Sequence, residues 1–405
     1  MRHVVVMVAT SYPRFPGDGV GSFMEPIAKG VAALGHEVHL VAPWHPAITR
    51  GAHEDGVHFH FFRYAPSRSL AVFGYAAGLS EDTRLRRAAW MVAPAAVAAG
   101  WFKAWRVATK KRATIMHGHW VVPGGFIAAA AAGRLPLIIS LHGSDVFVAE
   151  RHRIARKAAR DVLARADWTT ACSDDLRARA IAIGAPADRI EVVPYGVDTA
   201  RFAPDADARR SMRAELGIGD APMVFTAGRL VSKKGFAYLI KATPRLTASR
   251  PDLQVLIAGD GDLRPELERQ AQAVGSGRVR LLGNQSQSRI ARLAAAADVV
   301  AVPSIRDDAG NVDGLPNFAL ESMATAAPLV ATTAGGLGQL IEDGVTGRLV
   351  GERDGDALAE AIDSYLSDPV AARRVGAAGR HHVETEYSWA RTAARITAAY
   401  DRAVG

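Results

Sequence analysis

The stretch PSIRDDAGNVDGLPNFALESMA, residues 303–324, places two carboxylates around the expected start of a helix. Asp313 lies in its glycine-containing loop, Pro316 suits the first helical position, and Glu321 falls in the second helical turn. Free N–H groups at such a helix start attract anions, including phosphate. A ligand that carries both phosphate and hydroxyl groups would therefore satisfy the helix start and the two carboxylates together.

Around this stretch, short apolar runs alternate with longer segments of helical spacing. The expected strands form two series, residues 4–9, 37–42, 115, 137–141, 169 and 190–193, and residues 223–227, 253–258, 279–281, 299–302, 329–332 and 347–350. Alternating strands and helices in two blocks predict an α/β protein with two doubly wound parallel sheets. A length of 405 residues with 49% hydrophobic content is enough for two packed cores.

A basic motif follows the first strand of the second series. In GRLVSKKG, residues 228–235, Arg229, Lys233 and Lys234 stand between a strand and a helix. Ligands of open parallel sheets bind beyond the carboxyl ends of strands, where a guanidinium and an ammonium suit a diphosphate. The sequence does not separate the role of Lys233 from that of Lys234. The alternative is that these residues only open a surface helix.

Two motifs of the first series also follow strands. His142 comes directly after the strand at 137–141, and Asp145 either holds its ring in one tautomer or caps the next helix. The alternative for His142 is a structural histidine, the role that better suits His117 and His119.

The other motif is the loop PGDGVGS, residues 16–22, which contains Gly19 and Gly21 and leads into a helix with an expected capping box from Ser22 to Glu25. Its N–H groups could reach a diphosphate or an acceptor, or the loop is only flexible. It fails as a dinucleotide-binding fingerprint, because Ser22 occupies the place of the third glycine.

The ordered set of motifs resembles the retaining GT-B glycosyltransferases of the large bacterial family 4 type, the glycosyl transferases group 1. The resemblance rests on Asp313 and Glu321, which are separated by seven residues that include the sequence GLP. It extends from the SYPRFPGDG loop to the YSW sequence near the C-terminus. It implies a GT-B fold in which two Rossmann-like domains face each other across a cleft. It also implies a nucleoside-diphosphate sugar as donor and a saccharide or lipid-carried acceptor in cell-envelope or polysaccharide synthesis.

The resemblance also implies domain limits. We expect an acceptor-side domain over residues 1–196, a donor domain over 197–385, and a helix at 386–405 that crosses back to the first domain. The boundary between the two domains lies within the PYGVD motif at 194–198, which is followed by a polar, proline-containing stretch.

Residue roles follow from the same resemblance. Catalytic roles are implied for His142, Arg229, Lys234 and Asp313. Donor-binding roles are implied for Gly19, Gly21, Gly228, Arg229, Lys234, Gly259, Gly283, Asn284, Asp313, Gly314, Leu315, Pro316 and Glu321. In the family, the first acid contacts sugar hydroxyls and the second contacts the ribose. The chain departs from the pattern at Asp313, which reaches about 1.5 Å less far than Glu, and at Gln339, where Glu is usual.

No cofactor is expected. His and carboxylate residues show no metal-ligand spacing, and the cationic pair makes a divalent ion unnecessary for the phosphates. The single cysteine, Cys172, excludes an internal disulfide and a multi-cysteine zinc site, and it precedes an expected helix cap at Ser173. A formal net charge of +8 predicts an anionic partner. We expect this partner to be the nucleotide sugar and not a nucleic acid.

A basic and aromatic segment covers residues 84–112. The tryptophans Trp90, Trp101 and Trp105 are interleaved there with Arg84, Arg86, Arg87, Lys103, Arg106, Lys110 and Lys111. Such a helix suits peripheral contact with an anionic membrane, but core packing of the tryptophans beneath snorkelling cations explains the same pattern. The N-terminal apolar run is too short for a signal peptide, and no segment is long enough to span a bilayer. We expect a cytoplasmic protein, with or without this contact at the inner face of the membrane.

Three other functions fit parts of the pattern. A nicotinamide-dependent oxidoreductase would share the alternating strands and helices but not the pair of acids. A sugar-nucleotide epimerase or hydrolase would use the nucleotide site without a separate acceptor. A two-domain solute-binding protein would leave the cationic pair unexplained. Product analysis with and without acceptor separates these functions.

Overall fold

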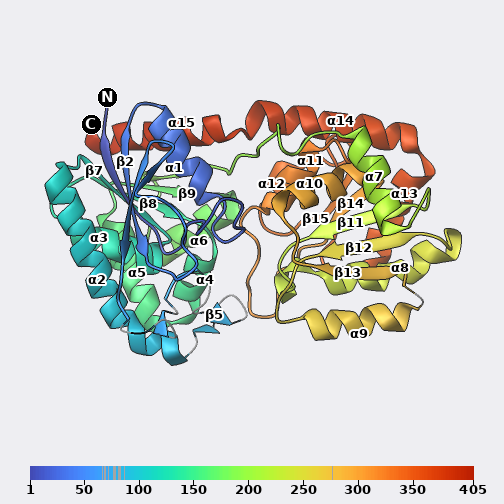
Figure 1. Cartoon of the computed structure of the whole chain (residues 1–405), viewed down its shortest axis with the longest axis horizontal. Coiled ribbons are helices and arrows are strands. Elements are labelled where there is room, and N and C mark those ends of the chain that lie inside the picture. Colours follow the sequence, from blue (N-terminus) through green and yellow to red (C-terminus); the bar gives the residue numbers. More distant parts are fainter. Residues whose placement is uncertain are drawn as a thin grey trace. The chain divides into compact units, whose positions relative to one another are not determined.

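A computed structural model of the chain describes residues 1–405 except 66, 68, 69, 72, 76–78, 81–83, 86 and 276, and it does not describe the side chains of 79, 80, 84, 85 and 87–90. The chain divides into two compact units (Figure 1). The first unit contains Met1–Pro194 and Trp389–Gly405, and the second contains Tyr195–Ser388.

These limits differ by two or three residues from the expected boundaries after 196 and 385. Val197 forms a parallel bridge with Ser388, and its N–H donates to the carbonyl oxygen of Tyr387 at 2.7 Å. This pairing holds the two segments that connect the units, one near Val197 and one near Ser388, within the second unit. The second unit therefore begins earlier and ends later in the sequence than expected.

The first unit is built on one eight-stranded sheet. Its strand order is β10-β9-β8-β7-β1-β2-β4-β3, and all neighbours are parallel except β3 and β4. The strands are β1 (Val4–Val8), β2 (Glu37–Pro43), β3 (His53–Glu54), β4 (Val57–Phe62), β7 (Ile115–His119), β8 (Leu137–Leu141), β9 (Trp168–Ala171) and β10 (Ile190–Val192). A two-residue pair, β5 (Leu79–Ser80) and β6 (Arg84–Leu85), stands apart from this sheet. The strand β4 was not predicted from the sequence, because its histidines break the apolar run VHFHFF.

Helices cover both faces of this sheet (Figure 1). Helix α1 (Met24–Ala33) and the C-terminal helix α15 (Trp389–Val404) share a core with Val5 and Met7 of β1. Helices α2 (Arg87–Lys111) and α3 (Phe126–Ala132) pack together on the other face. The remaining helices are η2 (Val121–Gly125), α4 (Ser144–Arg151), α5 (Arg153–Arg165) and α6 (Asp174–Ile183).

Two expectations about helix caps have different outcomes in this unit. Ser173 caps α6 by accepting the N–H of Leu176, as expected, and the neighbouring Cys172 is buried. The expected capping box at Ser22 is wrong, because α1 begins at Met24 and its N-cap residue, Phe23, has no side-chain acceptor to offer.

The second unit contains a six-stranded, wholly parallel sheet with strand order β13-β12-β11-β14-β15-β16. The strands are β11 (Met223–Ala227), β12 (Gln254–Ala258), β13 (Val279–Gly283), β14 (Val299–Val302), β15 (Leu329–Thr332) and β16 (Arg348–Val350). The helices are α7 (Ala206–Leu216), η3 (Ser232–Lys234), α8 (Phe236–Ser249), α9 (Arg264–Val274), α10 (Gln287–Ala296), α11 (Asn317–Ala324), α12 (Leu337–Leu340), α13 (Gly355–Ser367) and α14 (Pro369–Glu386). Two parallel-sheet α/β units therefore confirm the predicted fold class.

Candidate functional site

Three loops of the second unit meet at the carboxyl ends of the neighbouring strands β11, β14 and β15. Gly235 has φ +64°, and a side chain there would place its Cβ 1.8 Å from the carbonyl oxygen of Pro303. Gly335 has φ +56°, and its Cβ would lie 2.0 Å from the carbonyl oxygen of Asp313. Only glycine permits both approaches. They hold the lysine loop, the Asp313 loop and the loop after β15 against one another.

Two ammonium groups bind the carboxylate of Asp313. Nζ of Lys234 lies 2.7 Å from Oδ2, and Nζ of Lys233 lies 3.2 Å from Oδ1. The Ser304 hydroxyl also donates to Oδ2, at 3.4 Å. Burial of Asp313 by itself would raise its carboxyl pKa, but Lys234 and Lys233 outweigh burial and hold the pKa well below its ordinary value. Asp313 is therefore ionised, and the three charges leave one net positive charge for an anionic ligand.

Glu321 lies in the second turn of α11, as expected, and its carboxyl pKa is shifted in the opposite direction from that of Asp313. Burial raises the pKa of its carboxyl to about 7, although Arg201 and Lys234 act in the other direction. The helix itself begins one residue later than predicted: Pro316 is the N-cap, with φ −67° and ψ 114°, and not the first helical residue. Its ψ is extended because Pro316 still belongs to the incoming loop.

The other expected donor-binding residues lie around these loops. A Cβ at Gly228 would be 3.4 Å from Cε of Lys234. The N–H of Gly259 donates to the carbonyl oxygen of Gly283 at 2.8 Å. Arg229 and Asn284 are exposed, whereas Gly314, Leu315 and Pro316 are buried. The structure therefore brings Asp313, Lys233, Lys234 and Gly228 together, and it presents the Arg229 side chain to solvent.

His142 belongs to the first unit, directly after β8, and lies among aromatic rings. Phe23 and Trp120 contact it with ring centroids 4.7 and 4.8 Å away, and the His119 ring lies nearly parallel to it, with an interplanar angle of 12° and centroids 5.3 Å apart. Burial lowers the pKa of His142 to about 3, assisted by His117. His142 is therefore neutral at physiological pH and is a weak base.

Asp145 is not the helix cap that was one of the two roles expected for it. It lies in the first turn of α4, whose N-cap is Gly143. Its carboxylate accepts the backbone N–H groups of Val121, Gly143 and His142 at 2.7, 2.9 and 3.3 Å. Asp145 thus fixes the backbone conformation at and beside His142.

The glycine loop leads directly to Phe23, so it is brought close to His142. Within the loop, Asp18 accepts hydrogen bonds from the backbone and side chain of Arg14 and from the N–H of Val20. Gly21 has φ +66°, and a Cβ there would lie 3.2 Å from Cβ of Ser11. Gly19 is exposed. These bonds connect the loop to Arg14 and to its own backbone.

The residues that surround His142 were not predicted from the sequence. His119, Phe23 and Trp120 touch its ring, but they come from β7, the start of α1 and the turn after β7. His119 is fully buried, as a structural histidine would be, yet its Nδ1 lies 3.1 Å from Nε2 of His142. The HGHW spacing was the available signal, because alternate residues of a strand face the same way.

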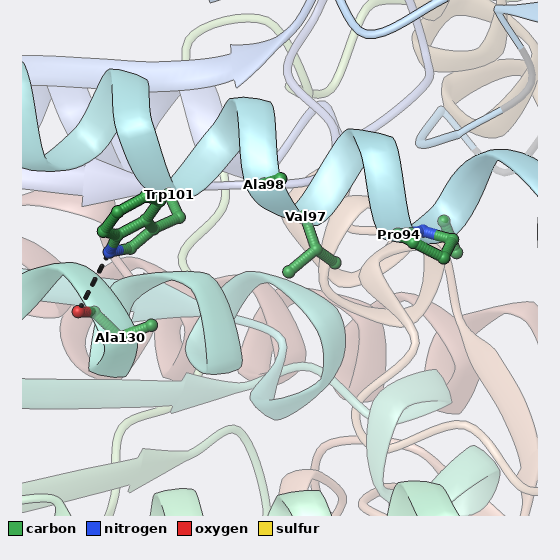
Figure 2. Close-up of a pocket in the computed structure, with 6 residues that line it drawn as sticks. Pro94, Val97, Ala98, Trp101 and Ala130 are labelled. Carbon is green, nitrogen blue, oxygen red and sulfur yellow. Dashed lines mark hydrogen bonds between the residues drawn. The ribbon is translucent and has the colours of Figure 1, made fainter.

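An apolar groove of about 470 Å³ opens between α2 and α3 (Figure 2). It is lined by Ala93, Pro94, Val97, Ala98, Trp101 and Ala130, none of which belongs to the expected site. Trp101 donates its Nε1–H to the carbonyl oxygen of Ala130 at 3.2 Å, as Figure 2 shows.

The exposure of the α2 tryptophans bears on the membrane hypothesis. Trp101 and Trp105 remain 42% and 47% exposed, which argues against simple core packing. The side chains of Arg84, Arg86, Arg87 and Trp90 lie outside the described residues. Among the helices that are described, none is sufficiently long and apolar to cross a membrane.

Two family models match the chain. The model described as Glycosyltransferase Family 4 matches residues 17–201, and the model described as Glycosyl transferases group 1 matches residues 208–382. The two matches correspond to the two structural units, and the second contains the Asp313 and lysine cluster.

Curated relatives agree with these models. The chain is 37% identical over 270 residues to a GDP-mannose-dependent α-(1-6)-phosphatidylinositol monomannoside mannosyltransferase of Mycolicibacterium smegmatis, covering 66% of this chain and 70% of the relative. The protein of the same description from Mycobacterium tuberculosis is 29% identical, covering 97% and 96%. Among solved structures, Anabaena HepE in complex with UDP has a TM-score of 0.78 at 20% identity, covering 99% and 100% of the two chains, which shows a shared fold.

Proposed function

Because this chain belongs to the family 4, group 1 glycosyltransferases, we propose that it transfers a hexose from a nucleoside-diphosphate sugar with retention of configuration. The proposed acceptor is a saccharide or a lipid-linked sugar of the cell envelope. The proposed reaction needs no metal ion, since cationic side chains neutralise the leaving diphosphate. The names of its mannosyltransferase relatives favour GDP-mannose as the donor.

The observation that carries this proposal is the contact of Lys233 and Lys234 with ionised Asp313 at the start of α8. An ammonium group has three N–H donors, so each lysine can bind the carboxylate and a diphosphate oxygen at once. Negative charge accumulates on the diphosphate as the glycosidic bond breaks, which makes a preorganised cation more stabilising in the transition state than in the ground state. Arg229, from the same loop, supplies a further guanidinium for the diphosphate.

Each carboxylate has a separate role in the proposal. Asp313 remains an acceptor at all working pH values and orients donor-sugar hydroxyl groups. Glu321, whose carboxyl pKa is raised to about 7 by burial, can donate or accept a hydrogen bond at the ribose.

His142 orients the donor and is not a general base in this proposal. A histidine whose pKa is about 3 takes up a proton poorly near neutral pH, because efficient general bases have a pKa near the operating pH. The leaving phosphate is the better acceptor for the proton of the attacking hydroxyl. Same-face attack assisted by that phosphate agrees with retention.

A calorimetric titration tests the donor site. UDP, GDP, ADP and NAD are titrated without metal into the wild type, Arg229→Ala and the control Arg373→Ala, whose residue is exposed on α14. We expect GDP to bind the wild type and the control, and Arg229→Ala to lose this binding. Binding of NAD alone would contradict the proposal. Product analysis with and without a mannoside acceptor then separates transfer from hydrolysis or epimerisation.

We further propose a peripheral contact between α2 and an anionic membrane. Trp101, Phe102 and Trp105 are 42–50% exposed, and Lys103, Arg106 and Lys110 lie in the same helix. Aromatic side chains favour the headgroup region, and each basic residue near an anionic surface adds about 1 kcal/mol. The apolar groove beside Trp101 offers space for part of an acyl chain.

Liposome flotation tests this contact. We expect the wild type to float with anionic vesicles and not with neutral ones. The double variant Trp101→Ala, Trp105→Ala should stay in the soluble fraction, while the control Ile154→Ala, which removes an exposed apolar side chain elsewhere in the first unit, should float. Recovery of the wild type wholly in the soluble fraction would contradict the proposal.

A further inference from the structure

His119 contacts His142 within the core of the first unit. Its side chain is fully buried, and its Nδ1 lies 3.1 Å from Nε2 of His142, which is within hydrogen-bond distance. The two rings are nearly parallel, with an interplanar angle of 12° and centroids 5.3 Å apart, so the two nitrogens lie close to the line between the ring centres. One of the two nitrogens must donate to the other, because both rings are neutral when burial holds the pKa of each well below its ordinary value.

The other nitrogen of His119 indicates which ring donates. Nε2 of His119 is buried and has no hydrogen-bond partner among the residues that the structure describes. A proton on Nε2 would therefore leave a buried N–H without an acceptor, whereas a proton on Nδ1 is used in the bond to His142. Unpaired buried N–H groups are rarer than under-satisfied acceptors, so the proton belongs on Nδ1.

His117 does not compete for that proton. Its Nδ1 lies 2.8 Å from the Tyr400 hydroxyl, and its Nε2 lies 2.8 Å from Oγ of Ser140. Oγ of Ser140 lies 2.7 Å from Oγ1 of Thr170. Both nitrogens of His117 are therefore engaged on their own side of the core. The centroid of the His117 ring lies 4.0 Å from that of the His119 ring, and this contact restrains the His119 ring.

We propose that His119 is a positioning residue that donates its Nδ1–H to Nε2 of His142 and so fixes His142 as the Nδ1–H tautomer. In this tautomer His142 keeps Nε2 as an occupied acceptor and offers Nδ1–H as its donor. The aromatic contacts with Phe23 and Trp120 restrain the same ring. The catalytic consequence rests on the proposed role of His142 in sugar transfer, but the tautomer itself does not.

Nitrogen-15 NMR of the full chain tests the tautomer directly. Histidines are labelled with 15N, and the His142 signals are assigned by their absence from His142→Ala. We expect an N–H type shift for Nδ1 of His142 and an unprotonated, pyridine-type shift for Nε2. Protonated Nε2 in the wild type would overturn the proposal, whatever the activity of the protein.

Two variants test the catalytic consequence. His119→Phe keeps a ring but removes the donor, and we expect kcat to fall about 10- to 100-fold with the donor KM unchanged, as for loss of a residue that orients a functional ligand. His119→Asn places an amide near the position of Nδ1 and should recover most of kcat. The control His60→Phe removes another histidine that is hydrogen-bonded to a histidine, His39, and should leave kcat unchanged.

The outcomes separate this proposal from the proposed function. Equal losses in His119→Phe and His119→Asn, or no loss in either, would overturn the positioning role of His119. Full activity in His142→Ala would contradict the role proposed for His142, while the NMR shifts would still establish or refute the tautomer. A His119→Phe protein that does not fold leaves the wild-type NMR result and His119→Asn as the deciding measurements.

Discussion

The Asp313 cluster of the second unit and the His142 cluster of the first unit solve the problem of burying polar groups differently. Asp313 stays ionised because two ammonium groups contact it. His142 stays neutral because burial disfavours its charged form and leaves it hydrogen-bonded to a neutral partner. The first arrangement suits binding of an anion, and the second suits orientation without proton transfer. Changes to charge should therefore matter most in the second unit, and changes to hydrogen-bond partners in the first.

Removing the charge of Asp313 should have the largest effect. Asp313→Asn leaves Lys233 and Lys234 facing each other without a carboxylate, and removal of one partner of a buried ion pair costs about 3 to 5 kcal/mol. Equilibrium urea unfolding measures the loss. Asp161→Asn, which breaks an exposed pair with Lys157, should change stability little. Similar small changes in both variants would show that the cluster is effectively solvated.

Lys234→Ala tests the Asp313 cluster through its effect on enzyme activity. Truncating one partner of a buried charge pair costs about 2 to 5 kcal/mol, here as lost stabilisation of the transition state measured by kcat/KM for the donor. Lys233→Ala should cost less, because Nζ of Lys233 is farther from Asp313, 3.2 against 2.7 Å. Lys241→Ala, on the exposed face of α8, is the control. Unchanged kcat/KM in Lys234→Ala would refute the assignment of this lysine.

Glu321 predicts a pH dependence of stability. Its carboxyl pKa is raised from 4.5 to about 7 in the folded chain, so the folded state retains a proton that the unfolded state has lost. Stability should therefore fall by roughly 3 kcal/mol as the pH rises from about 4.5 to about 7, and then level off. Urea unfolding across this range should show the fall in the wild type and in the exposed control Glu360→Gln, but a smaller fall in Glu321→Gln. An identical pH profile in Glu321→Gln would contradict the raised pKa.

The smallest expected effect concerns the hydrogen bonds of the buried, neutral histidines in the first unit. Tyr400→Phe removes the hydroxyl that lies 2.8 Å from Nδ1 of buried His117, and an unsatisfied buried group costs about 1 to 3 kcal/mol. Tyr365→Phe is the matched control, because the buried Tyr365 hydroxyl has no partner among the described residues. Chemical unfolding should show a loss for Tyr400→Phe and almost none for Tyr365→Phe. Equal stabilities would show that the hydrogen bond to His117 contributes nothing net.

Local patterns in the sequence were enough to predict most of the fold. Each run of buried β-branched residues, such as Val4–Val8, became a central parallel strand, because a strand covered on both faces is apolar throughout. The strand β4 (Val57–Phe62) escaped prediction because three-dimensional packing, and not its mixed sequence, allows histidines at its alternate positions. Helix starts were less predictable, as Phe23 and Pro316 show, since an N-cap depends on how the preceding loop approaches the helix.

The sequence by itself determined the two α/β units, the family and the residues with suitable chemistry, because motif order and apolar periodicity are properties of neighbouring residues. Only the tertiary structure decided which groups meet. Lys233 contacts Asp313, 80 positions further along the chain, because Gly235 and Gly335 bring their loops together. His119 reaches His142 because the parallel strands β7 and β8 are neighbours. Tyr400 reaches His117 from the other end of the chain because helix α15 packs on the sheet of the first unit. Protonation follows from those contacts and from burial, which a linear pattern of residues does not specify.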